Sequence, residues 1–232
     1  LRLAGGALVA STILVTLPTD AAAIPAFARK YKVSCNLCHN PFPALTAFGE
    51  QFAGNGFRMA IDEEPKDTIA TGDDLLTLPA NVPLALRLDA YAQLYADGKA
   101  ATDFQLPFNL KLLSGGTLGK KLSYYIYFLF AERGEVAGVE DAFIHWNDIA
   151  GAPVDLAVGQ FQVSDPMFKR ELRLEVLDYA IYKVLVGLQP ANLTYDRGLM
   201  ASADLAGFSL TATLVNGDGI PAANELFRYD NG

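Results

Sequence analysis

The chain has 232 residues, enough for one large domain or two smaller ones. Hydrophobic residues make up 51% of it, which is high for a soluble globular protein, and charged residues make up 19%. The net charge is −8 and there is no block of Lys or Arg, so the composition argues against nucleic acid as a partner.

Residues 1–23 have the pattern of a signal peptide. Arg2 supplies the positive start, residues 3–17 are apolar or small, and Pro18 ends the run before the small residues Ala21, Ala22 and Ala23. An apolar run of about 15 residues is short for a hydrocarbon layer of about 30 Å. The pattern therefore favours a cleaved export signal over a membrane anchor that stays attached.

A short motif with unusual chemistry follows the predicted signal. Cys35 and Cys38 are the only cysteines of the chain, and His39 is one of two histidines. The spacing C-x-x-C-H is the attachment signature of c-type haem. Two thiols three positions apart can add to the two vinyl groups of one haem edge, and the adjacent imidazole then binds the iron. The motif predicts one covalently attached haem c, with His39 as the proximal iron ligand.

Three other interpretations explain this motif less well. A structural disulfide is compatible with an oxidising compartment, but it would not need His39. A thioredoxin-like redox centre needs a βαβ setting, which this region lacks. A structural zinc ion wants four ligands, and only Cys35, Cys38, His39 and the distant His145 are on offer. Haem attachment explains all three adjacent residues.

Residues 24–60 are expected to form one small haem-binding unit. Phe42, Leu45, Phe48 and Phe52 recur at steps of three and four, which predicts an apolar stripe on a helix that stops at Asn55–Gly56. The segment "FARKYKVSCNLCHNPFPALTAFGEQFAGNGFRM" resembles the short monohaem region found before barrel sequences in some exported bacterial cytochromes. The resemblance implies that the Phe-rich helix covers the haem face.

The sixth iron ligand is left open by the sequence. Met59 lies 20 residues after His39 in the same unit, and a thioether ligand would raise the reduction potential. His145 lies on the polar side of an expected strand, where a pore-lining role is the more common one. An open sixth position that binds small ligands is the third interpretation.

Residues 61–81 are acidic and contain Pro, which predicts a linker. From residue 82 the hydrophobic period changes to two, in runs such as "VPLALRLDAYAQLYA" and "EDAFIHWND", with Gly- and Asn-containing turns between them. Several runs reach nine or more residues, the length of a tilted membrane strand, and carry Tyr or Trp near their ends. This pattern favours an antiparallel outer-membrane β-barrel over a soluble β-sandwich. Residues 165–183 interrupt the pattern and are expected to form a long loop.

The same region resembles the phosphate-selective porin family of bacterial outer membranes. The resemblance is carried by "VEDAFIHWNDIAGAPVDLAVGQFQVSDPMFKREL" and "YDRGLMASADLAGFSLTATLVNGDG", in the order of a G-Q-F strand, a charged loop, an Asp-Arg-Gly strand start and a Gly-Phe hairpin. It covers residues 82–232. Porins of that family have more strands than are legible here, so the barrel is expected to be truncated within this chain.

The predicted protein is mainly β, with a small α-helical haem c unit before the barrel, and it is not expected to be an enzyme. We expect electron transfer at the outer membrane, with other cytochromes or periplasmic electron carriers as partners and the haem unit in the periplasm or the barrel lumen. The alternative is a diffusion porin with a structural or sensory haem. The phosphate preference of the porin family is not carried over, since no cluster of Lys or Arg is visible. Seven charged residues could set the ion selectivity of a lumen, although each is more commonly one of many solvated charges on a polar face: Arg87, Asp89, Lys111, Asp141, Arg170, Arg173 and Arg197.

Overall fold

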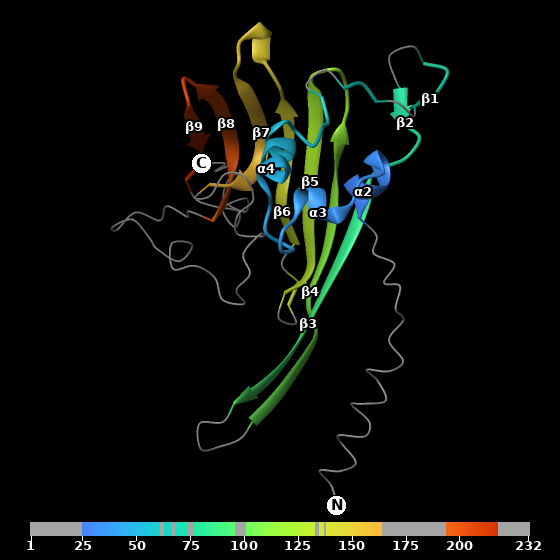
Figure 1. Ribbon diagram of the computed structural model, residues 1–232, viewed down its shortest axis with the longest axis vertical. Helices are drawn as coiled ribbons and strands as arrows, with labels where there is room; N and C mark the ends of the chain where they lie inside the picture. Colours follow the sequence, from blue (N-terminus) through green and yellow to red (C-terminus); the bar gives the residue numbers. More distant parts are fainter. Residues whose placement is uncertain are drawn as a thin grey trace, which may run out of the picture.

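The computed structural model describes residues 25–60, 63–65, 68–73, 77–95, 101–132, 135–136, 138–163 and 194–217. The predicted signal peptide, the predicted loop over 165–183 and the last residues of the chain lie outside the described residues. The chain is mainly β, as predicted: seven strands form one antiparallel sheet and a few short helices precede it (Figure 1).

The sheet is a meander in which every strand pairs with its neighbour in the sequence. Its strands are β3 (Leu84–Tyr95), β4 (Ala101–Thr117), β5 (Leu122–Glu132), β6 (Gly138–Trp146), β7 (Asp155–Gln162), β8 (Tyr195–Leu205) and β9 (Phe208–Val215). The β3–β4 hairpin projects well beyond the ends of the other strands (Figure 1). The predicted alternation of β6 is confirmed, since Phe143 and His145 are buried while Ile144 and Trp146 are exposed.

The two faces of the sheet differ in what covers them. One face, which we call the inner face, packs on the N-terminal helices through the buried side chains of Tyr125, Tyr127, Phe143 and Phe161. The outer face carries exposed apolar side chains across its strands. Exposed side chains of these strands include Leu86, Leu88, Ile126, Phe130, Ile144, Trp146, Val158, Leu199, Leu210 and Leu214.

Register shows that the outer face is continuous from strand to strand. Ile144 pairs with Val158, Val158 with Leu199, and Leu199 with Leu214. Side chains of directly paired residues lie on the same side of a sheet, so these residues form one apolar row. Exposed apolar patches of this kind mark surfaces that contact another apolar phase.

The N-terminal unit contains α2 (Ala26–Tyr31), α3 (Cys35–Cys38) and α4 (Ala47–Gly54). Helix α2 lies beside β4, and α4 packs on β5 and β6 through Phe52 and Ala53 (Figure 1). Phe27, Phe52 and Phe57 stack or meet edge to face, and Phe57 stacks on Tyr125 of the sheet at 4.7 Å between ring centroids. Burial of each such ring contributes roughly 1.5–3 kcal/mol. The unit and the inner face therefore share one aromatic core.

The expected start of the Phe-rich helix needs correction. Helix α4 begins at Ala47, where the Thr46 side chain accepts a hydrogen bond from the Gly49 N–H, so Phe42 and Leu45 of the predicted stripe precede the helix. The predicted end at Asn55 is confirmed. Within the predicted linker, the described residues include a small hairpin of β1 (Thr68–Ala70) and β2 (Thr77–Pro79).

Strand β4 also departs from the expected alternation. The alternation in "LPFNLKL" predicts that Phe108 shares a side with Leu110 and Leu112, but the register shifts opposite Asp89–Tyr91. The Phe108 ring is 5% exposed and meets the Tyr91 ring at 4.5 Å.

Among the described residues, no helix is long and apolar enough to cross a membrane.

Candidate functional site

The Cys-rich motif forms a single helical turn. Ser34 caps α3 by accepting a hydrogen bond from the Asn36 N–H, and the turn closes where the His39 N–H donates to the Cys35 carbonyl at 2.9 Å. Residues three apart lie on the same side of a helix, so Cys35 and Cys38 share one side of α3. Cys35 is exposed and Cys38 is half-buried, and burial raises the pKa of the Cys38 thiol. Both thiols are free, and neither is engaged in a disulfide.

The imidazole of His39 has a fixed orientation. Its Nδ1 lies 3.0 Å from the carbonyl oxygen of Pro43. A carbonyl oxygen can only accept a hydrogen bond, so Nδ1 is the atom that carries the proton. In the neutral ring Nε2 then keeps its lone pair, and Nε2 is therefore the atom that a metal ion can bind. Metal-binding histidines in proteins commonly donate their other N–H to such a carbonyl.

The loop that presents the Pro43 carbonyl is closed by backbone and side-chain bonds. The Asn40 N–H donates to the Ala44 carbonyl, and the Thr46 N–H donates to the Cys38 carbonyl. The Thr46 hydroxyl donates to the Leu37 carbonyl at 2.7 Å. Helix α4 lies so close behind α3 that a Cβ on Gly49 would overlap the Cys38 carbonyl. Thr46 and Gly49 therefore fix α4 against the motif.

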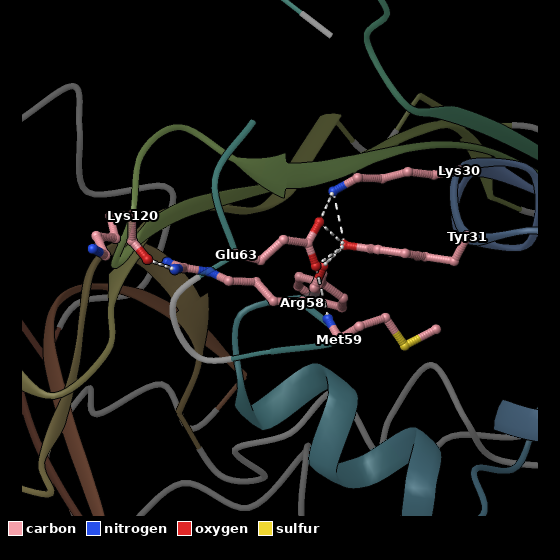
Figure 2. A network of polar contacts seen from close by, with 7 residues as sticks. Lys30, Tyr31, Arg58, Met59, Glu63 and Lys120 are labelled. Carbon is pink, nitrogen blue, oxygen red and sulfur yellow. Dashed lines mark hydrogen bonds and ion pairs between the residues drawn. The ribbon is translucent and has the colours of Figure 1, made fainter. Parts of the chain in front are cut away.

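Four apolar side chains of the N-terminal unit are exposed: Leu37, Phe42, Phe48 and Met59. Phe42 lies against the His39 ring, with 4.9 Å between centroids. The backbone N–H of Met59 donates to Glu63, and its thioether points away from that carboxylate (Figure 2). The distal-ligand role of Met59 stays a prediction.

A buried carboxylate ties the two ends of the unit together (Figure 2). The Glu63 side chain is 7% exposed and lies 3.2 Å from the Lys30 ammonium. It also lies 3.0 Å from the Tyr31 hydroxyl and accepts the Met59 N–H. The Tyr31 hydroxyl has one proton, which can go to Glu63 or to the Phe57 carbonyl at 3.0 Å. Burial and the nearby Glu63 raise the pKa of Tyr31 well above its ordinary value.

Arg58 anchors the unit to the sheet. It is 1% exposed, and its Nη1 donates to the Lys120 carbonyl at 2.6 Å in the turn before β5. Burial lowers the pKa of Arg58, while Glu63 and Tyr31 act in the opposite direction; the guanidinium stays charged. Sequence reasoning missed Arg58 and Glu63, since each looks like an ordinary solvated charge. The Asn55–Gly56 turn before Arg58 was the one visible signal that the chain reverses there.

The charged residues that were candidates for a lumen fall in three groups. Arg87, Asp89 and Lys111 lie together on β3 and β4, where Arg87 and Asp89 form an ion pair at 2.8 Å. Asp141 is 2% exposed and Arg197 is half-buried on β8. The remaining two, Arg170 and Arg173, lie outside the described residues.

His145 does not line an open surface. It is 7% exposed, and a Cβ on Gly56 of the N-terminal unit would come within 2.6 Å of its Nδ1. His145 is therefore buried where the sheet contacts the N-terminal unit, and the expectation that it lines a pore is wrong. The sequence could not show this contact, because it joins residues far apart in the chain.

Within the described ranges, no group of three or more His, Cys, Asp or Glu side chains is arranged to hold a metal ion on its own. The motif instead offers two thiols and one imidazole, which is the donor set that covalent haem attachment uses. No protein-family model, curated protein or solved structure matches this chain.

Proposed function

We propose that this chain is a haem c-binding electron-transfer protein of the bacterial outer membrane. Cys35 and Cys38 would hold the porphyrin through two thioether bonds, and His39 would bind the iron through Nε2. The observation that carries the proposal is the Nδ1 contact of His39 with the Pro43 carbonyl, which leaves Nε2 available in the neutral ring. Haem held in this way would carry one electron by changing between its ferric and ferrous states.

The protein itself would orient the iron ligand. The bonds from Thr46 to Cys38 and Leu37 keep the loop closed over His39, so the imidazole cannot rotate away. The aromatic core shared with β5 and β6 holds the unit on the inner face. These contacts favour a fixed electron carrier.

The membrane part of the proposal rests on the outer face of the sheet. Its exposed apolar row runs across neighbouring strands, while charged side chains such as Arg87 and Lys111 lie on the inner face. Apolar-out and polar-in alternation is the pattern of outer-membrane barrel strands. We therefore propose that the sheet is part of a barrel in outer-membrane lipid, with the haem unit on its lumen side.

This placement also separates electron transfer from the alternative of a diffusion porin. Phe52, Phe57 and Arg58 of the unit cover the inner face where solute would pass. A hydrocarbon layer of about 30 Å is too thick for one haem to bridge unaided. Other cytochromes or periplasmic electron carriers are therefore the proposed partners.

The test is electron exchange with a soluble c-type cytochrome, measured by stopped-flow absorption on the full chain in detergent. The wild type should exchange electrons, and the Cys35→Ala/Cys38→Ala variant should not. Ion conductance of the same two proteins in a planar bilayer is the companion measurement. High conductance without electron exchange in the wild type would favour the diffusion porin and overturn the proposal.

A further inference from the structure

A cation of the sheet reaches the loop that orients His39. The guanidinium carbon of Arg87, on β3, lies 5.3 Å from the ring centroid of Phe42. The Phe42 ring in turn meets the His39 ring at 4.9 Å, with an angle of 60° between the planes. Arg87 and His39 are thus joined through a single aromatic ring, although 48 positions separate them in the sequence.

The position of Arg87 is fixed from behind. Its Nε donates to Asp89 Oδ1 at 2.8 Å, and Asp89 Oδ2 accepts from Asn109 Nδ2 at 3.3 Å on the neighbouring strand. Lys111, which pairs with Arg87 across the strands, lies over the Tyr127 ring instead. Arg87 is therefore the cation of this group that contacts the motif loop.

The ring between the two groups needs such support. Phe42 is 60% exposed, so packing alone does not hold it. A guanidinium over the face of an aromatic ring is attracted by the ring quadrupole, and an edge-to-face contact with a second ring adds to this. The two contacts together hold Phe42 against the imidazole and bring a positive charge near it.

We propose that Arg87 is a positioning residue for the iron ligand, and that the Arg87–Asp89 pair sets the reduction potential of the bound haem. This inference rests on the proposed function. A positive charge near the iron disfavours the ferric state, which carries one more positive charge than the ferrous state, and so raises the potential. The carboxylate of Asp89 offsets that charge, so removing either partner shifts the potential, and the two shifts have opposite signs.

The size of the shift follows from the separation. The guanidinium carbon is at most about 10 Å from the centre of the imidazole, given the two ring contacts. At that range, in a partly exposed site, we expect the ratio of ferric to ferrous haem at fixed applied potential to change by about threefold to tenfold. Tenfold corresponds to about 59 mV for a one-electron couple.

The experiment is an equilibrium redox titration of the full haem-loaded chain in detergent, followed by the absorption of the reduced haem. Arg87→Met should lower the potential, Asp89→Asn should raise it, and Arg87→Lys should stay near the wild type because it keeps the charge. Lys121→Met is the control. It removes one positive charge from an ion pair with Asp148, in the turn before β5, and leaves the Phe42 contact intact.

A purely structural role would give a different result. Local loosening would shift Arg87→Met and Asp89→Asn in the same direction, or lower the haem content without moving the potential. Either result, or shifts no larger than that of Lys121→Met, would overturn the inference and leave the proposed function standing. A wild type without covalent haem would instead overturn the proposed function, and the inference with it.

Discussion

Gly56 is the position where the docking of the N-terminal unit on the sheet can be tested most sharply. Its φ is +69°, and a Cβ would overlap the Ser123 hydroxyl and come within 2.6 Å of His145 Nδ1. Ser123 is 0% exposed and His145 is 7% exposed, so neither side chain can move out of the way into solvent. Gly56→Ala should therefore push the unit away from the inner face.

The magnitude has two parts. A side chain in the left-handed region costs about 1–2 kcal/mol, and inserting a methyl group into a packed site costs about 1–3 kcal/mol. Gly72→Ala is a matched control, because φ of Gly72 is +85° and nothing lies within 4 Å of its Cβ position. Gly56→Ala should lower the free energy of unfolding by about 1–3 kcal/mol more than Gly72→Ala does.

The assay is urea unfolding of the full chain in detergent, followed by circular dichroism. Hydrogen exchange gives a local measurement: the exchange rate of the α4 amides should rise in Gly56→Ala, while the amides of the strands stay protected. Adding Ser123→Gly removes the overlapping hydroxyl and should recover part of the loss. Equal losses for Gly56→Ala and Gly72→Ala would refute the docking of the unit on this face.

Three further predictions concern the motif, the ion network and the outer face. Gly49→Ala should lower the free energy of unfolding by about 1–2 kcal/mol, because the added Cβ overlaps the Cys38 carbonyl, although Ala favours a helix more than Gly does. The control Gly119→Ala, whose Cβ would lie 3.9 Å from the nearest atom, should be neutral in the same urea titration. The raised pKa of Tyr31 means that only the unfolded state ionises just above pH 10, so stability is full below pH 10 and falls as the pH rises beyond it; Tyr31→Phe should reduce that slope in alkaline unfolding curves, and an unchanged slope would contradict this. Ile126→Lys on the outer face should destabilise a lipid-embedded sheet by about 2–4 kcal/mol in unfolding from bilayers, whereas Val136→Lys, 80% exposed outside the strands, should not; neutrality at both sites would argue for a soluble sheet.

The strands were predictable because their signal is local. Alternation along β6 places Phe143 on the opposite side from Ile144 without knowledge of the partner strands, although which side is buried is known only from the structure. The C-x-x-C-H motif was equally legible, because its spacing alone places Cys35 and Cys38 on one side of a turn.

The contacts between the unit and the sheet could not be predicted in the same way. Arg58 looks solvated until the turn at Lys120 is placed over it, and Glu63 belongs to a segment whose Pro and acidic residues resemble a linker. The apolar step from Phe42 onward resembled a helix, but the cap at Thr46 sets the true start. Such features depend on long-range packing, which overrides local propensity.

The central claim is covalent haem at the motif, and an absorption spectrum tests it most directly. The full chain would be matured with a c-type haem assembly system and measured before and after reduction with dithionite. The reduced wild type should show a sharp α-band that is lost in Cys35→Ala/Cys38→Ala and changed in His39→Ala. A wild-type spectrum without a Soret band would show that the motif does not bind haem and would overturn the proposed function.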